Sequence, residues 1–503
     1  MNDSSIPSGG LYILSMSLHG FVRGHDIELG RDADTGGQIT YVVEQVRALS
    51  ARDDVRKVQL FTRQLFGPNV DASYAKEREP LSERAEIVRI PCGPRRYLRK
   101  EKLWPYLDEF VDRTLKFLRA QGELPDVVHG HYADAGYVGS QIARLLGVPF
   151  VFTGHSLGRV KRQRLSENRS DLEALDRQFN FPQRIEAEEI SLDTASVVTT
   201  STQQEVDEQY ALYERYEPER KEVIPPGVDL SRFRPPREDD EKPPIAHSLD
   251  RFLQDPDKPL VVALARPDER KNLASLVRAY GDSEKLREKT NLAILAGTRD
   301  DIKSMGKAPR RVLTDLLLEV DRLDLWGKVA LPKTHRPEDV PELYRWTART
   351  RGVFVNPALT EPFGLTLIEA AASGVPIVAT HDGGPRDIIA ACHNGVLVDP
   401  FDDADITRGI EEVVLDPQTW ESMSKAGIEG ARRTYGWDGH AEKLFNEVRR
   451  VILGSRPRAP ITTEGPRMLK RAERAIVMEL DGLLDVDRDG VGELRRRLRE
   501  ADV

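Results

Sequence analysis

The chain has 503 residues, enough for two or more domains, and its 39% hydrophobic and 31% charged residues are typical of a soluble globular protein. Its net charge of −9, from 74 basic and 83 acidic residues, argues against a general nucleic-acid or membrane-surface binder. The two cysteines, Cys92 and Cys392, lack metal-ligand spacing, and the chain shows neither a signal-peptide core nor a membrane-length apolar run, so we expect a reduced, cytoplasmic protein.

Apolar segments alternate with amphipathic ones in the first part of the chain. We expect strands at residues 11–17, 58–62, 85–90, 126–131, 149–155 and 196–201. After the first of these, a glycine-bearing loop leads into a helix whose apolar face comprises Ile39, Val42, Val43, Val46 and Leu49. This alternation is typical of a parallel sheet with helices on both faces.

A second series of the same kind follows a stretch rich in proline and charge. It predicts strands at 260–266, 291–297, 328–333, 352–358, 375–380 and 395–400. We therefore expect an N-terminal domain over 1–230, a linker over 231–257 and a C-terminal domain over 258–437, with a helix near 438–455 packing back onto the first domain. Ligands of such sheets bind at the carboxyl ends of the strands.

The first series carries candidate binding groups in its loops. Gly36 and Gly37 stand where a loop opens onto a helix, and free amides there favour an anion, although an ordinary glycine turn explains them equally well. His155 follows a strand end beside glycines, so we favour a functional histidine. Two basic runs, at 92–106 and 159–164, suggest a phosphate site in an otherwise acidic chain, with a solvated charged surface as the alternative.

The second series offers a further pair of basic residues. Arg266 and Lys271 lie close in sequence across a turn, where both could bind one diphosphate. The alternative is a surface ion-pair cluster with Asp268 and Glu269.

Two carboxylates and two glycine-bearing segments lie further along. Glu361 belongs to a loop and Glu369 to the helix that follows, and carboxylates accept paired hydrogen bonds from sugar hydroxyls. A capping carboxylate plus a solvated one is the alternative. The exposed backbone of this loop, and that near Gly383 and Gly384, suits hydroxyl or phosphate oxygens. A nucleotide sugar would use groups of all these kinds.

Eight segments together resemble glycosyltransferase family 4, whose members are retaining enzymes of the GT-B fold. They are DADTGGQITYVVE, TGHSLGRVK, RIEAEE, STQQE, VIPPGVD, ARPDERKN, NPALTEPFGLTLIEAAASGVPIVAT and GGPRDI. Glu361 and Glu369 mark the broad family, and DTGGQ, GHSLGR and RIEAEE point to the sucrose-phosphate synthases within it. The resemblance implies an α/β fold of two doubly wound, Rossmann-like domains that face each other across a cleft.

The same resemblance implies transfer of glucose from UDP-glucose to fructose 6-phosphate, giving sucrose 6-phosphate and UDP. The catalytic residues would be His155, Arg266, Lys271 and Glu361. The donor would be bound by Gly36, Gly37, Arg266, Lys271, Glu361, Phe363, Gly364, Leu365 and Glu369. The acceptor would be bound by Gln38, Arg96, Lys100, Tyr132, Ser156, Lys161 and Arg184. The acceptor hydroxyl would attack from the face that UDP leaves; no metal is required, and stimulation by magnesium stays open.

The tail over 456–503 has a different character. A linker precedes VMELDG, which resembles the first motif of haloacid-dehalogenase-type phosphatases. That motif begins with a nucleophilic aspartate, whereas this chain has Glu479 there and Asp481 as the second acid, and it ends at Val503. We expect no phosphatase activity, so a separate sucrose-phosphate phosphatase would be a partner.

Three alternatives stay open. A mannosylfructose-phosphate synthase would keep the class but use GDP-mannose, and ADP-glucose is a further candidate donor. A non-catalytic nucleotide-sugar sensor would keep the fold without turnover. A nucleotide-dependent oxidoreductase would need G-x-G-x-x-G after a strand, a spacing that DTGGQ does not supply. The sequence decides neither the donor base, nor the oligomeric state, nor regulation.

Overall fold

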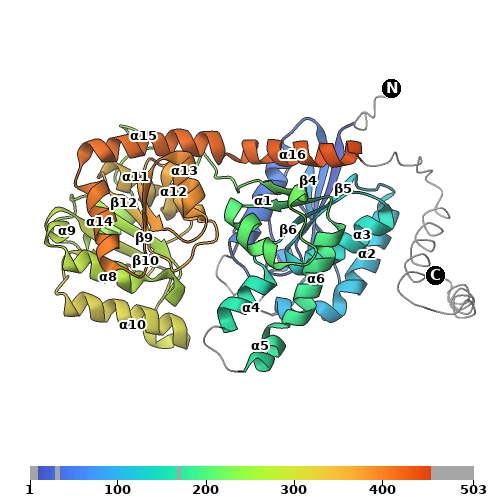
Figure 1. The fold of residues 1–503 in the computed structure, drawn as a ribbon, viewed down its shortest axis with the longest axis horizontal. Coiled ribbons are helices and arrows are strands. Elements are labelled where there is room, and N and C mark those ends of the chain that lie inside the picture. Colours follow the sequence, from blue (N-terminus) through green and yellow to red (C-terminus); the bar gives the residue numbers. More distant parts are fainter. Residues whose placement is uncertain (1–8, 29–33, 69, 167–170, 455–503) are drawn as a thin grey trace, which may run out of the picture. The chain divides into compact units, whose positions relative to one another are not determined.

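The structure is a computed structural model that describes residues 9–28, 34–68, 70–166 and 171–454 (Figure 1). The expected tail over 456–503, with its phosphatase-like motif, lies outside the described residues. Within them the chain forms two compact units. Unit 1 holds the residues up to Thr199, those of Gln209–Glu222 and those from Phe445 onward, and unit 2 holds Thr200–Glu208 and Val223–Leu444. None of the described helices combines the length and apolarity that crossing a membrane would need.

Unit 1 is built on an eight-stranded sheet of order β3-β4-β2-β1-β5-β6-β7-β8. The strands are β1 Leu11–Met16, β2 Val55–Arg63, β3 Arg78–Pro80, β4 Ala85–Ile90, β5 Val127–His131, β6 Phe150–Thr153, β7 Val197–Thr200 and β8 Lys221–Val223. The pairs from β4 to β7 are parallel, whereas β3 runs antiparallel to β4. The α-helices are α1 Gly37–Ser50, α2 Leu107–Gln121, α3 Tyr132–Leu146, α4 Gly158–Ser166, α5 Leu172–Phe179 and α6 Phe181–Thr194.

The elements of unit 1 follow from burial on both faces of its sheet. All six residues of β1 are buried, as expected for a central parallel strand that helices cover on both sides. The predicted apolar face of α1 is confirmed, because its five members are all buried: Ile39, Val42, Val43, Val46 and Leu49.

Unit 2 has a fully parallel six-stranded sheet of order β11-β10-β9-β12-β13-β14. The strands are β9 Leu260–Ala265, β10 Asn291–Ala296, β11 Val329–Ala330, β12 Val353–Asn356, β13 Ile377–Thr380 and β14 Gly395–Val398. Its α-helices are α7 Pro244–Asp250, α8 Leu273–Asp282, α9 Glu284–Lys289, α10 Lys307–Arg322, α11 Asp339–Arg349, α12 Leu365–Ala372, α13 Pro385–Cys392, α14 Asp403–Val414 and α15 Pro417–Thr434. The last helix, α16 Trp437–Gly454, begins in unit 2 and ends in unit 1.

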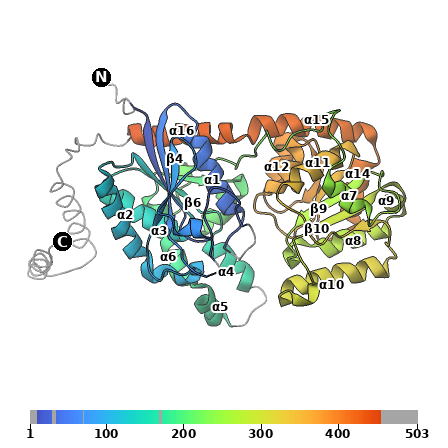
Figure 2. The same cartoon turned by 180° about the vertical axis from the view of Figure 1, so that it is seen from behind.

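Helices cover both faces of this second sheet. In both views its strands lie between α11 and α12 on one side and α8 and α10 on the other (Figure 1, Figure 2). Successive strand residues alternate between the two cores: Val262 and Phe354 pack with the first group of helices, and Val261 and Val353 pack with the second. The doubly wound α/β prediction is therefore confirmed for both units.

The structure differs from the sequence expectation in the domain boundary, in two short strands and in the linker. Thr200–Glu208 and residues 223–230, expected in the N-terminal domain, belong to unit 2. The short strands β3 and β8 were not predicted, because three residues give too little alternation to recognise. The expected linker over 231–257 contains α7, whose Ile245 and Leu249 are buried in the core of unit 2. The surrounding sequence is rich in proline and charged residues, so the helical spacing of these two apolar residues was not recognised.

Candidate active site

The candidate residues of unit 2 follow the carboxyl ends of neighbouring strands. Arg266 comes directly after β9, Glu361 follows β12, and Gly383 follows β13. Because β9, β12 and β13 are adjacent and parallel, their carboxyl ends meet at one edge of the sheet.

Glu361 is the centre of this group. The Nζ of Lys271 donates to its Oε2 at 2.6 Å, and the Nδ2 of Asn356 donates to the same oxygen at 3.0 Å. Two predicted site residues that are far apart in sequence are thus in contact. Asn356 was not predicted, although it ends a strand at the same edge.

The glycines at 383 and 384 have a different role from the one expected. The Glu361 amide donates to Asp382 O at 3.0 Å, and the Gly384 amide donates to Glu361 O at 3.0 Å. Gly383 has φ +109°, and a Cβ there would overlap the carbonyl of Glu361. The expectation that the Gly384 amide binds a ligand is therefore wrong: it binds Glu361, and the glycines allow two loops to approach closely.

Arg266 makes no direct ion pair in the surface cluster around Asp268, although its charge helps to lower the pKa of that carboxyl. Arg270 pairs with Asp268, and Arg311 approaches Glu269 at 3.3 Å. Arg266 is exposed and has no carboxylate partner among residues 9–28, 34–68, 70–166 and 171–454. The two acids nearest in sequence are engaged elsewhere, so the guanidinium of Arg266 is available to an anion.

The start of α12 presents free amides near a partly buried carboxyl group. Gly364, in the left-handed region, precedes the helix, and the amides of Phe363, Gly364 and Leu365 donate no hydrogen bond to any described residue. Glu369 lies one turn further, and burial raises its pKa to about 8, against the weak opposing effect of Arg232. These groups suit hydroxyl and phosphate oxygens.

In unit 1 the glycine-bearing loop ends at the N-terminus of α1. Gly36 is the N-cap residue and no side chain caps the helix there. A side chain at Gly36 would meet no described atom within 4 Å, so packing does not demand glycine at this position. The Nε2 of Gln38 is buried without a hydrogen-bond partner in the described part of the chain. Gly36, Gly37 and Gln38 thus place donors at a helix N-terminus for which the described residues provide no acceptor.

His155 lies directly beyond β6 in a strained conformation, with φ +55°. Its Nε2 is 3.1 Å from Nδ1 of His131, and its ring meets that of Tyr41 edge-on at 4.9 Å. Burial, with a smaller contribution from His19, lowers the pKa of His155 to about 3. The imidazole is therefore neutral at physiological pH and serves as a hydrogen-bonding group.

Three of the predicted acceptor residues gather at one end of α3. Tyr132, its first residue, has φ +78° and is almost fully buried. The guanidinium of Arg184 lies 4.6 Å from the Tyr132 ring centroid, and Lys100 Nζ lies 6.0 Å from it. Two cationic side chains thus converge on one buried aromatic ring.

Lys161 belongs to the same cluster. Burial, and then the charges of Lys100 and Arg184, lower its pKa to about 8. Lys100 pairs with Asp34, which also accepts from Tyr97 Oη at 2.9 Å. Lys161, in contrast, forms no direct ion pair with an acid in the described part of the chain, although the charges of Glu101 and Asp34 oppose part of the lowering of its pKa.

The two remaining acceptor predictions are placed differently. Ser156 is exposed, and its carbonyl accepts a hydrogen bond from Nη2 of Arg184, which puts it beside the cluster. The Arg96 side chain is exposed, and its backbone carbonyl accepts from Arg63 at 2.9 Å. No contact among the described residues joins the Arg96 side chain to the cluster.

One pair beside the cluster was missed by the sequence analysis. His19 Nδ1 is 2.9 Å from Asp134 Oδ2, both residues are buried, and the His19 ring meets Tyr132 edge-on at 4.5 Å. His19 lies just beyond β1, at the carboxyl edge that the strand pattern singles out, and that position was a usable signal.

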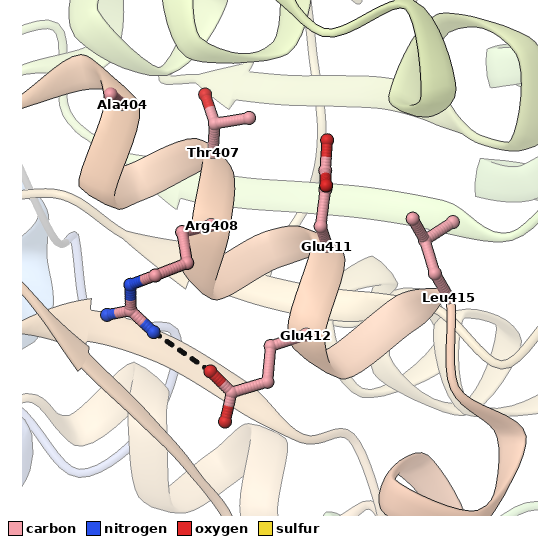
Figure 3. Close-up of a pocket in the computed structure, with 6 residues that line it drawn as sticks. All are labelled: Ala404, Thr407, Arg408, Glu411, Glu412 and Leu415. Carbon is pink, nitrogen blue, oxygen red and sulfur yellow. Dashed lines mark hydrogen bonds and ion pairs between the residues drawn. The ribbon is translucent and has the colours of Figure 1, made fainter.

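A hollow elsewhere in unit 2 is not part of these groups. It runs along α14 and is lined by Ala404, Thr407, Arg408, Glu411, Glu412 and Leu415 (Figure 3). Arg408 and Glu412 pair at 2.9 Å within it. None of the predicted site residues lines this hollow.

Comparison with known families accounts for both units. The family described as Glycosyl transferases group 1 matches residues 248–430, and the one described as Sucrose synthase first GT-B domain matches residues 5–229. With its two doubly wound units, the chain belongs to the GT-B glycosyltransferases.

Within that class the resemblance to sucrose-phosphate synthases is confirmed. A probable sucrose-phosphate synthase of Oryza sativa subsp. indica is 44% identical over 95% of this chain and 49% of its own length. The enzyme of Zea mays is 45% identical over 87% of this chain and 47% of its own length. The solved sucrose-phosphate synthase of Thermosynechococcus elongatus has a TM-score of 0.68 and 26% identity, over 88% of this chain and all of that one. The chain spans about half the length of the curated relatives it matches.

Proposed function

We propose that the chain transfers glucose from UDP-glucose to fructose 6-phosphate, with retention at the anomeric carbon, giving sucrose 6-phosphate and UDP. The names of the relatives support this reaction. The observation that carries it is the cluster around Tyr132, which suits the phosphate of the acceptor.

The charge of that cluster fits a phosphorylated sugar. Lys100 is paired with Asp34, and Arg184 is paired with Glu188 at 3.0 Å. Lys161 adds a positive charge that has no direct ion-pair partner among the described residues, with Glu101 and Asp34 acting on it only at longer range. A phosphate dianion supplies that partner, and lysine and arginine both bind it through charge-assisted hydrogen bonds.

The donor would be held by unit 2. Arg266 and Lys271 would meet the diphosphate and stabilise the charge that develops on it as UDP leaves. The free amides before α12 would bind the diphosphate and sugar oxygens, Glu361 the glucose hydroxyls and Glu369 the ribose hydroxyls.

The reaction itself needs few protein groups. The fructose hydroxyl attacks the anomeric carbon from the face that UDP leaves, the bond to the diphosphate breaks, and a departing phosphate oxygen takes the proton. His155, neutral in its partly buried position, would hydrogen-bond the transferred glucose. The proposal requires no metal ion, because arginine and lysine supply the positive charge, and it leaves stimulation by magnesium to measurement.

A product assay by mass spectrometry tests the proposal. The full chain is incubated with UDP-glucose and fructose 6-phosphate, and with fructose or mannose 6-phosphate as control acceptors. A phosphorylated disaccharide formed only with fructose 6-phosphate, with equal UDP release, is the expected result. Product from GDP-mannose or ADP-glucose instead would keep the class and refute the donor. Donor binding without turnover by any pair would refute an enzymatic role and favour a sensor.

Two further expectations belong to this proposal. The product keeps its phosphate, so a separate sucrose-phosphate phosphatase would act on it. That partner and the cytoplasmic location both stay predictions, which co-purification and fractionation from the source cells would test.

A further inference from the structure

Glu188, in α6, holds several parts of the acceptor cluster at once. It is only 1% exposed, and both of its oxygens accept hydrogen bonds. Arg184 Nε donates to Oε1 at 3.0 Å, the Gly158 amide donates to both oxygens at 3.0 and 2.9 Å, and the Tyr213 hydroxyl donates to Oε2. One buried carboxylate thus fixes a side chain of its own helix, the first residue of α4 and a tyrosine from a later segment.

The start of α4 is shaped around this carboxylate. A Cβ at Gly158 would lie 2.8 Å from Glu188 Oε2, so a larger residue would push the two apart. The next amide, that of Arg159, donates to Tyr213 Oη at 3.0 Å. The first two amides of α4 therefore bind Glu188 and its tyrosine partner, which sets the position of the helix that carries Lys161.

Arg184 is oriented by the same contacts. Glu188 holds its Nε, the Ser156 carbonyl holds Nη2, and the Tyr132 ring lies against its face. Nη1 makes no hydrogen bond with any residue that the structure describes. Protein acceptors thus occupy Nε and Nη2 of the Arg184 guanidinium, and Nη1 is left for a ligand.

We propose that Glu188 is the positioning residue of the acceptor-phosphate site: it orients Arg184 directly and Lys161 through the start of α4. The inference rests on the proposed function, since it names the residue that builds the site for the phosphate of fructose 6-phosphate. Glu188 itself touches no substrate, because its oxygens are occupied by protein donors.

The variant Glu188→Gln in the full chain tests this. Glutamine keeps the size and one accepting oxygen, but in either orientation its NH2 group faces the Gly158 amide together with Arg184 Nε–H or the Tyr213 hydroxyl, so the donors that now share two oxygens lose an acceptor. Loss of a charge-assisted hydrogen bond predicts that KM for fructose 6-phosphate rises about ten- to hundredfold. The kcat at saturating acceptor and the KM for UDP-glucose stay within about twofold. With unphosphorylated fructose as a poor acceptor, kcat/KM is expected to match that of the wild type.

The matched control is Glu186→Gln. Glu186 is exposed on the same helix, two residues earlier, so the variant removes the same charge without touching the cluster. It is expected to keep the wild-type KM for fructose 6-phosphate. Equal losses with both acceptors and the donor in Glu188→Gln, or an unchanged KM for fructose 6-phosphate, would overturn the inference.

A milder variant covers the case in which Glu188→Gln fails to fold. Tyr213→Phe removes one donor to the carboxylate and leaves the Arg184 pair, so the KM for fructose 6-phosphate should rise a few-fold with kcat unchanged. No change would overturn the inference.

Calorimetric binding of fructose 6-phosphate separates this inference from the proposed function. If the wild type binds the sugar phosphate but forms no disaccharide, the proposed function fails, and weaker binding by the variants still supports Glu188. If the wild type turns over normally and the variants bind fructose 6-phosphate as well as it does, the inference fails and the function stands. No phosphate-dependent binding by the wild type also overturns the inference.

Discussion

The acceptor affinity should fall at alkaline pH because Lys161 loses its proton. Burial and two neighbouring cations lower the pKa of this lysine to about 8. The second pKa of a sugar phosphate is near 6, so the ligand is already a dianion at neutral pH and does not change further. Only the protein side of the contact titrates between pH 7 and pH 9.

The magnitude follows from the protonated fraction. A group with a pKa of about 8 is about 90% protonated at pH 7, half at pH 8 and about 10% at pH 9. If only the protonated lysine binds phosphate, kcat/KM for fructose 6-phosphate falls about tenfold between pH 7 and pH 9. At saturating acceptor kcat should change much less, because bound phosphate stabilises the charged lysine.

The assay measures kcat/KM for fructose 6-phosphate from pH 6.5 to 9.5 at constant ionic strength and saturating UDP-glucose. Lys161→Arg keeps the charge above pH 9.5, so its profile should be flat even if its affinity differs. The control Arg164→Lys, at an exposed position of the same helix, should keep the wild-type slope. A flat wild-type profile, or the same slope in Lys161→Arg, would refute the reasoning.

Further predictions concern unit 2. Gly383→Ala places a Cβ on the Glu361 carbonyl and forces alanine to φ +109°, so it should lower the melting temperature and cut kcat/KM for UDP-glucose at least about tenfold. Gly439→Ala, where a Cβ meets nothing within 4 Å, should do neither, and equal behaviour of the two variants would contradict the close approach. Burial raises the pKa of Glu369 to about 8. Between about pH 5 and 8 the folded protein therefore keeps a proton on this carboxyl that the unfolded chain has already lost. The free energy of unfolding contributed by Glu369 consequently falls as pH rises through this range. Glu369→Gln should therefore gain in melting temperature over the wild type across that range; a difference that does not vary with pH would show that Glu369 is not the group responsible.

Much of the fold could be predicted because strands buried on both faces of a sheet have an easily recognised sequence pattern. Buried parallel strands read as short apolar runs, and the predicted runs at 11–17 and 291–297 coincide with β1 and β10. Short edge elements such as β3 have no such pattern. The helix α7 was hidden because proline and charge dominate the composition around its two buried residues.

The candidate site could be predicted in part. Residue type and position after a strand were enough to single out Lys271 and Glu361, which the structure brings into contact. The partner of each charged group could not be predicted, because pairing depends on which loops meet. Gly384 illustrates this: its amide looked free in the sequence, but a loop from the neighbouring strand accepts its hydrogen bond.

The contact between Lys271 and Glu361 bears on how the protein would release its nucleotide product. Before any ligand binds, the lysine expected to meet the diphosphate is already neutralised by the carboxylate expected to meet the sugar. Binding of a nucleotide sugar would break this ion pair but give each residue a new partner. The phosphates would contact the lysine, and the sugar hydroxyls would donate to the carboxylate. The nucleotide alone compensates only the lysine and leaves the half-buried Glu361 carboxylate with Asn356 as its remaining side-chain donor. The resting ion pair therefore competes more strongly with the product than with the donor, which favours product release and weak inhibition by UDP.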